Sequence, residues 1–79
     1  MVVAPPVVLE QGVYRDTIFG ANEKSKALGP LIFDLAAHWH IPFVDAGAHI
    51  QSSEIDGIHF DPDDHVTLGQ AIAQKVASL

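Results

Sequence analysis

Residues 41–46 of this 79-residue chain read IPFVDA, a short and almost continuous apolar run. A strand with one face in water alternates apolar and polar residues, whereas a parallel strand covered on both faces is apolar throughout. The run is also too short for an ordinary helix. We therefore predict a strand at residues 41–46 that belongs to a parallel sheet.

Upstream of this strand, apolar residues recur at helical spacing, which predicts a helix that begins near Asn22. The stripe consists of Leu28, Leu31, Ile32, Leu35 and Trp39. Asn22 is the expected N-cap, and Glu23 in the first turn complements the helix dipole. Gly29 and Pro30 fall inside the pattern, so we expect a kink there or a second segment that begins at Pro30.

Downstream of the strand, we expect a loop over residues 47–60 and then a last helix. Asp61 suits the N-cap, Pro62 suits the first helical position, and Asp63 and Asp64 favour the first turn. The apolar face of this helix consists of Val66, Leu68, Ala71, Ile72, Val76 and Leu79. Both helices are thus predicted to be amphipathic.

The start of the chain adds a second strand at Val2–Ala4, which Pro5 and Pro6 end because proline cannot extend a sheet ladder. Residues 7–20 are expected to form mostly loop. The order strand, helix, strand, helix indicates an α/β fold. The aromatic residues expected in its core are Phe33, Trp39 and Phe43. Two strands leave sheet edges and faces bare, so the chain is expected to associate with itself or with a missing N-terminal half.

Composition narrows the class of protein. Hydrophobic residues make up 48% of the chain and charged residues 18%, a balance that suits a buried layer. The net charge of -6 argues against nucleic-acid binding. The chain has no cysteine and no apolar run of about 20 residues, and residues 1–6 lack the basic region and long apolar stretch of a signal peptide. We therefore expect no disulfides, no membrane contact and a cytoplasmic location.

Asp56 and His59 are the first candidates for chemistry, because they stand three residues apart in a loop before a capped helix. The aspartate can accept the Nδ1–H of the histidine, which fixes the tautomer and leaves Nε2 free as a general base. Spacing alone also fits a structural interpretation, in which Asp56 is a turn residue and His59 an ordinary loop histidine.

A resemblance to a known family bears on this choice. The segment DGIHF at residues 56–60, followed by Asp-Pro and an amphipathic last helix, resembles the terminal block of SGNH/GDSL hydrolases. Residues 2–6, 23–28 and 42–47 are similar to segments of the bacterial arylesterase/acyltransferase branch, in the same order. The resemblance implies that residues 1–79 are a single C-terminal segment of such a domain, with a partial flavodoxin-like three-layer α/β fold.

By this resemblance, Asp56 orients His59, and His59 deprotonates the nucleophilic serine of a carboxylesterase that acts on short-chain esters. Ile58 and Phe60 would flank the base and help to wall the acyl pocket. The Gly-Asp-Ser block that carries the family nucleophile does not occur in residues 1–79. The glycine and asparagine blocks of the family's oxyanion hole also lie upstream of the region covered.

A substitute nucleophile would have to come from the hydroxyls of the chain, which are Ser25, Ser52, Ser53, Thr67 and Ser78. Ser25 and Ser78 lie on predicted helices and are expected in solvent. Ser53 is the candidate nucleophile, because a loop that folds back on itself would bring it near His59. The structural interpretation of Ser52 and Ser53 is an ordinary pair of loop serines.

The five histidines show no recognised spacing of metal ligands, so we expect no metal and no cofactor. They are His38, His40, His49, His59 and His65. The leading hypothesis is a truncated SGNH-type carboxylesterase that binds a small ester, forms a homo-oligomer and depends on the Asp56/His59 pair. The alternatives are a non-catalytic fragment or oligomerising interaction module, and one half of a split esterase.

Overall fold

Two strands and two α-helices alternate in the computed structural model, which describes residues 1–79. Strand β1 covers Val2–Ala4, helix α1 Ala21–His38, strand β2 Phe43–Asp45 and helix α2 Pro62–Ala77, with a short 3-10 helix η1 at Ala46–Ala48. The predicted order of strand, helix, strand, helix is confirmed.

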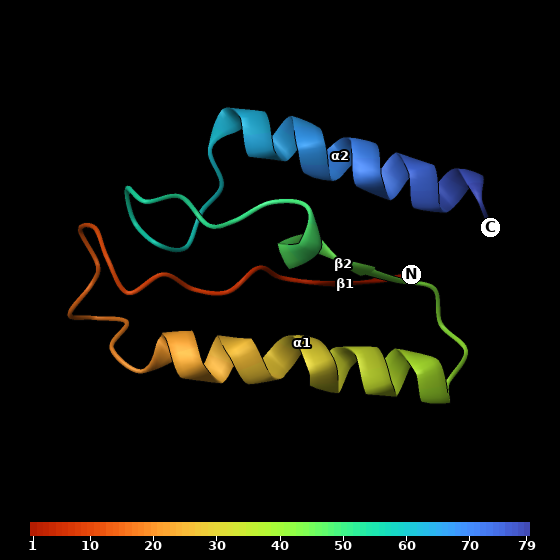
Figure 1. The fold of residues 1–79 in the computed structure, drawn as a ribbon, viewed down its shortest axis with the longest axis horizontal. Helices are drawn as coiled ribbons and strands as arrows, with labels where there is room; N and C mark the ends of the chain where they lie inside the picture. Colours follow the sequence, from red (N-terminus) through yellow and green to blue (C-terminus); the bar gives the residue numbers. More distant parts are fainter.

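The two strands form a parallel pair in which Val3 lies opposite Val44. Helix α1 contacts both strands and α2 contacts β2. Figure 1 shows the helices on opposite sides of the strands. The predicted parallel strand with helices on both sides, and with it the α/β fold class, is therefore confirmed. Strand β2 is shorter than predicted at both ends: it begins at Phe43, and it ends at Asp45, whose side chain accepts a hydrogen bond from the Gly47 N–H and starts η1.

Helix α1 corrects the predicted N-cap and excludes one of the two alternatives predicted for Pro30, the start of a second segment; a kink there stays a prediction. Its N-cap is Gly20, with a φ of 89°, and Asn22 lies inside the first turn, so Asn22 is not the N-cap. The helix also continues through Pro30 as one element rather than beginning again there. A proline at this position removes one backbone hydrogen bond, a cost that the remaining turns of an 18-residue helix can sustain.

Helix α2 begins as the sequence predicts. Asp61 is the N-cap, Pro62 occupies the first position, and Asp63 and Asp64 lie in the first turn. The Asp61 side chain forms no capping hydrogen bond; its backbone carbonyl accepts from the N–H groups of Asp64 and His65. Proline at the first position and acidic residues at the positive end of the helix dipole fix this boundary.

The core is small and made mostly of alanine. Its buried apolar residues are Ala4, Ala36, Val44, Ala46 and Ile50. The prediction of an aromatic core is wrong for Phe33 and Trp39, which are 53% and 64% exposed. Phe43 is half-buried and packs edge-to-face on Phe33 with 5.4 Å between ring centroids. No second layer covers these rings within the chain, which explains their exposure.

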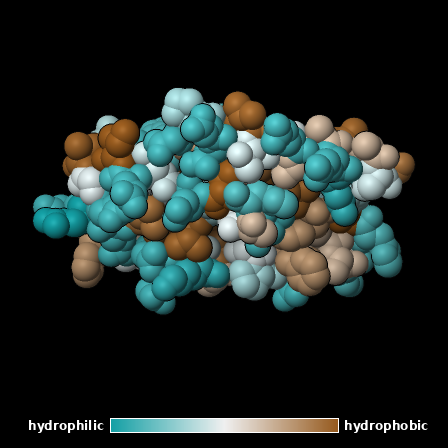
Figure 2. Space-filling model, turned by 45° about the horizontal axis from the view of Figure 1, so that its top comes forward, coloured by the Kyte–Doolittle hydropathy of each residue, from teal (hydrophilic) through white to brown (hydrophobic).

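The apolar stripes of both helices are largely in solvent as well. In α1, Leu31 and Leu35 are 64% and 59% exposed, and α2 has no buried residue. Figure 2 shows hydrophobic side chains that reach the surface at several places between hydrophilic ones. Neither helix is long and apolar enough to cross a membrane.

The molecule is flat, with extents of 40 × 27 × 13 Å. Its radius of gyration is 13.4 Å, whereas a compact domain of this length has about 12 Å. It exposes 5471 Å², whereas a monomer of 8.5 kDa exposes roughly 4,700 Å². The excess of about 800 Å² matches one partner's share of an ordinary protein–protein interface.

Candidate active site

The loop before α2 is closed by its own backbone. The Ser53 N–H donates to the His59 carbonyl and the Gly57 N–H donates to the Ser53 carbonyl, both at 2.7 Å. Gly57 has a φ of 77°, a left-handed conformation that favours glycine. These bonds bring residues 53 and 59 together at the neck of the loop and leave Asp56 near its tip.

The Asp56 carboxylate holds His59 in a defined orientation. Its Oδ1 accepts the N–H groups of Ile58 at 2.8 Å and His59 at 2.9 Å. Its Oδ2 lies 2.5 Å from Nδ1 of the His59 ring. The Asp56 side chain is 14% exposed and that of His59 is 76% exposed. No hydrogen bond occupies Nε2 of this largely exposed ring.

These hydrogen bonds lower the pKa of the Asp56 carboxyl from its ordinary 3.8 to about 2. The largest contribution comes from the Ile58 N–H, followed by the His59 ring and then the His59 N–H. Each of these donors stabilises the ionised carboxylate. Asp56 is therefore negatively charged at neutral pH and suited to orient an imidazole.

The lowered pKa predicts a loss of stability in acid. The folded chain holds the Asp56 proton less tightly than the unfolded chain, so the carboxylate stabilises the fold above about pH 4, and this contribution disappears as the pH falls towards about 2. We expect urea unfolding to show that wild type loses more stability than Asp56→Asn between about pH 5 and about pH 2. The other acidic groups are common to both proteins, so parallel curves would contradict the prediction.

The structure does not bring the Ser53 hydroxyl to the His59 ring. Ser53 is buried, and its Oγ accepts the Ile55 N–H at 3.1 Å. Ser52 is buried too, and its hydroxyl donates to the Val7 carbonyl at 2.9 Å. Both hydroxyls hold the loop, as the structural interpretation expects. A nucleophilic role for Ser53 stays a prediction that this geometry does not support.

The other hydroxyls lie elsewhere. Ser25 was expected in solvent, but it is half-buried: its Oγ accepts the Val8 N–H and donates to the Asn22 carbonyl. Thr67 is exposed on α2, and Ser78 is exposed at its C-terminus and bonds to the Lys75 carbonyl. None of these forms a hydrogen bond with His59.

No acyl pocket surrounds the pair within this chain. Ile58 is 38% exposed, and Phe60 is half-buried against the ring of His65, with 5.3 Å between centroids. None of the four cavities is lined by Asp56 or His59. The histidines do not converge either, and no group of three or more His, Asp or Glu side chains is placed to hold a metal ion. The pair lies at an open surface.

Comparison with known proteins gives a consistent result. No model of a protein family matches the chain, and no curated protein sequence matches it. Among solved structures, the inhibitor-bound aryl esterase of M. smegmatis is 36% identical with a TM-score of 0.88, over 99% of this chain and 37% of that one. A carbohydrate acetylesterase from Sinorhizobium meliloti is 40% identical with a TM-score of 0.82, over 98% and 37%.

A second carbohydrate acetylesterase family member from Sinorhizobium meliloti is 28% identical, with a TM-score of 0.83 over 94% of this chain. The chain thus spans about 36–37% of the length of the structures that it matches. Two parallel strands between helices form a small α/β fold that matches part of the fold of these esterases, and an Asp–His pair lies before its last helix. The chain is therefore similar to about a third of the length of known arylesterase and carbohydrate acetylesterase structures, which is consistent with the predicted C-terminal part of such a domain.

Proposed function

We propose that this chain supplies the acid–base part of a carboxylesterase site, and that the nucleophilic serine comes from a segment outside residues 1–79. The observation that carries the proposal is the Asp56–His59 contact, with Oδ2 2.5 Å from Nδ1 and Nε2 unoccupied. In this arrangement Nε2 can take the proton of a serine hydroxyl and return it to the leaving alcohol.

The open surface around Asp56 and His59 supports the proposal that a second segment, outside residues 1–79, completes the site. An esterase also needs donors that stabilise the oxyanion, and each such donor is worth about 10²–10³ in rate. Nothing in residues 51–60 offers a free pair of N–H groups beside His59, since those of Ile58 and His59 bind the Asp56 carboxylate. The substrates that we propose for the completed site are short-chain esters; the chain is similar to an aryl esterase and to a carbohydrate acetylesterase.

A chimera tests the proposal directly. In it, this chain replaces the segment of the M. smegmatis aryl esterase that it matches with a TM-score of 0.88. We expect the chimera to hydrolyse a short-chain chromogenic ester, and the isolated chain to show no turnover above that of free imidazole. A folded chimera without turnover would contradict the proposal.

A serine-directed covalent inhibitor, read by mass spectrometry, identifies the nucleophile in both proteins. The adduct is expected on the serine that the aryl esterase contributes to the chimera. An adduct on Ser53 of the isolated chain, together with turnover, would show instead that the chain is a minimal esterase with its own nucleophile.

The second candidate function is an oligomerising interaction module without catalysis. The observation in its favour is the exposed apolar stripe of α1, in which Leu31 is 64% and Leu35 is 59% exposed. Burial of such side chains contributes about 1.5–3 kcal/mol each. In this alternative, loss of Asp56 impairs folding and no variant or chimera hydrolyses esters.

Self-association through α1 is expected under either function. We expect sedimentation to give a dimer or larger species, and Leu31→Lys combined with Leu35→Lys to weaken the assembly more than about tenfold. The matched control is Gln70→Lys with Gln74→Lys, which adds the same charges at the same spacing on exposed positions of α2. A wild-type chain that sediments as a monomer would contradict this expectation.

A further inference from the structure

Residues 7–13, here termed the strap, run between α1 and the loop that carries Asp56 and His59 (Figure 1). Along the strap, the backbone hydrogen bonds of successive residues go alternately to the loop and to α1. The Val7 carbonyl and the Leu9 N–H bond to the loop, whereas both backbone groups of Val8 bond to α1. The strap is therefore held on both sides by hydrogen bonds.

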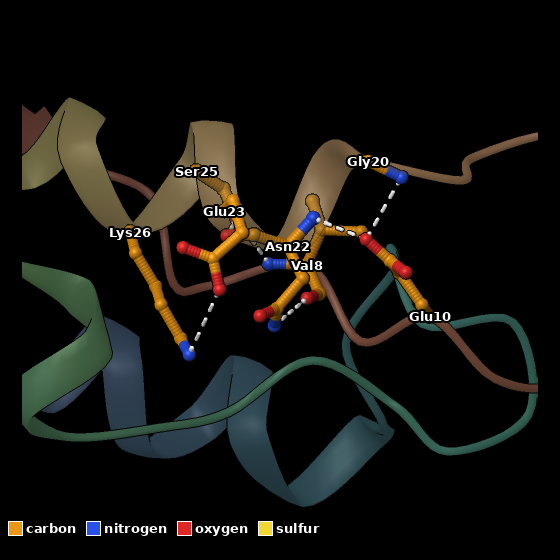
Figure 3. Close-up of polar contacts among 7 residues, drawn as sticks. All are labelled: Val8, Glu10, Gly20, Asn22, Glu23, Ser25 and Lys26. Atoms are coloured by element: carbon orange, nitrogen blue, oxygen red, sulfur yellow. Dashed lines mark hydrogen bonds and ion pairs between the residues drawn. The ribbon is translucent and has the colours of Figure 1, made fainter.

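On the α1 side, polar side chains attach the strap to the first turns of the helix (Figure 3). The Val8 N–H donates to Ser25 Oγ at 2.9 Å, and Asn22 Nδ2 donates to the Val8 carbonyl at 2.8 Å. Glu10 Oε1 accepts the N–H groups of Gly20 and Asn22, both at 2.9 Å. Because Gly20 has no side chain to cap α1, the Glu10 carboxylate takes that role at the positive end of the helix dipole.

On the loop side, the strap holds the two residues that flank Asp56. The Leu9 N–H donates to the Gly57 carbonyl at 2.9 Å, and the Val13 N–H donates to the Ile55 carbonyl at 3.2 Å. The backbone of Asp56 is thus fixed before and after the residue. A shift of the strap changes the position of the carboxylate that holds the His59 ring.

From these contacts we propose that Glu10 is a positioning residue for the Asp56–His59 pair and acts through the strap. The inference rests on the proposed function, in which the orientation of His59 matters. Glu10 lies between the two anchored stretches of the strap, and its carboxylate makes two charge-assisted bonds, which are stronger than neutral ones. Without it, residues 9–13 are tied to the loop alone and can move with it.

The test measures the tautomer of His59 by ¹⁵N NMR in the isolated chain, at about pH 9, above the ordinary titration range of imidazole. We expect the Nδ1–H form to predominate in wild type. In Glu10→Ala, the ratio of the Nδ1–H to the Nε2–H form should fall about five-fold, the effect of losing one ordinary hydrogen bond. The tautomer ratio should fall less in Glu10→Gln than in Glu10→Ala, since the amide oxygen of glutamine can still accept both N–H groups.

The matched control is Glu23→Ala, which removes another carboxylate from the same end of α1. Glu23 lies 3.7 Å from Lys26 and has no bond to the strap. A folded Glu10→Ala with the wild-type ratio, or an equal change in Glu23→Ala, would overturn the proposal. If circular dichroism shows that Glu10→Ala does not fold, the tautomer ratio of His59 is measured in Ser25→Ala instead. This change frees the Val8 N–H from α1, so the proposal expects the ratio to fall there too.

The two proposals fail in different ways. If the Nδ1–H form predominates in wild type but is unaffected by Glu10→Ala and Ser25→Ala, only the positioning role is lost. If wild type itself lacks this form, and Asp56→Asn leaves the tautomer ratio unchanged, the Asp56–His59 pair and the proposed function are lost together.

Discussion

Replacing His59 by alanine is expected to lower ester hydrolysis by the aryl-esterase chimera about 10³- to 10⁴-fold. The ring is the only group beside Asp56 that can exchange a proton with a serine, and its Nε2 is unoccupied. Alanine removes the base but leaves the backbone bonds of the loop, because the His59 N–H and carbonyl still pair with Asp56 and Ser53. The change should therefore appear in kcat with little effect on folding.

The matched control is His49→Ala, which removes an exposed histidine ring from the same connection between β2 and α2. Its expected activity is that of the unmodified chimera. The activity of the Asp56→Asn chimera should lie between those of the His59→Ala and His49→Ala chimeras, because the base remains but its orientation is lost. Equal rates for the His59→Ala chimera and its parent would remove His59 from the mechanism.

The Asp56–His59 contact could be predicted from sequence because its determinants are local, although only the resemblance favoured a catalytic interpretation over a structural one. The two residues are three apart, and the turn between them contains Gly57. Helix α2 follows closely, with Asp61 as its N-cap and Pro62 as its first residue. Short-range spacing and helix-start signals fix such a unit whatever surrounds it. The strands and the helix order followed from apolar patterns for the same reason.

The strap could not be predicted, since its partners are far apart in sequence. Val8 pairs with Ser25 across 17 residues, and Ser52 with Val7 across 45. A pattern of single residues does not show such pairs, so Asn22 was assigned to the helix cap and Ser25 to the solvent. The one available signal was Glu10, an acidic residue that follows the apolar residues 7–9, and nothing in the sequence links it to α1.

The aromatic and leucine residues of α1 and its C-cap, Trp39, show a different limit of prediction from sequence. Their spacing correctly predicts a helix with an apolar face, but Leu31, Phe33 and Trp39 are more than half exposed. Apolar periodicity predicts that one face of a helix is buried, but it does not show whether the same chain or another chain covers that face. In residues 1–79 that cover is missing, so the predicted core appears as surface.

Replacing Gly57 by alanine is expected to destabilise the fold more than any other single change considered. Gly57 has a φ of 77°, and an added Cβ would lie 1.8 Å from the Leu9 carbonyl oxygen and 2.9 Å from its carbon. Both atoms belong to backbone, so the strap has to move away from the loop. Left-handed strain and overpacking together should cost at least about 3 kcal/mol of unfolding free energy. That is a large share of the roughly 4–12 kcal/mol expected for a chain of this length.

The control is the same substitution at Gly69, which lies in α2 with no atom near the added Cβ. There alanine should stabilise the helix by roughly 1 kcal/mol, since glycine is the poorer helix former. Urea unfolding followed by circular dichroism measures both. If the unfolding free energy falls in Gly57→Ala and rises in Gly69→Ala, the loss at Gly57 comes from its contact with the strap and not from alanine in general. Equal stability of Gly57→Ala and wild type would show that the strap does not press against the Asp56 loop, and the positioning of His59 through residues 7–13 would lose its structural basis.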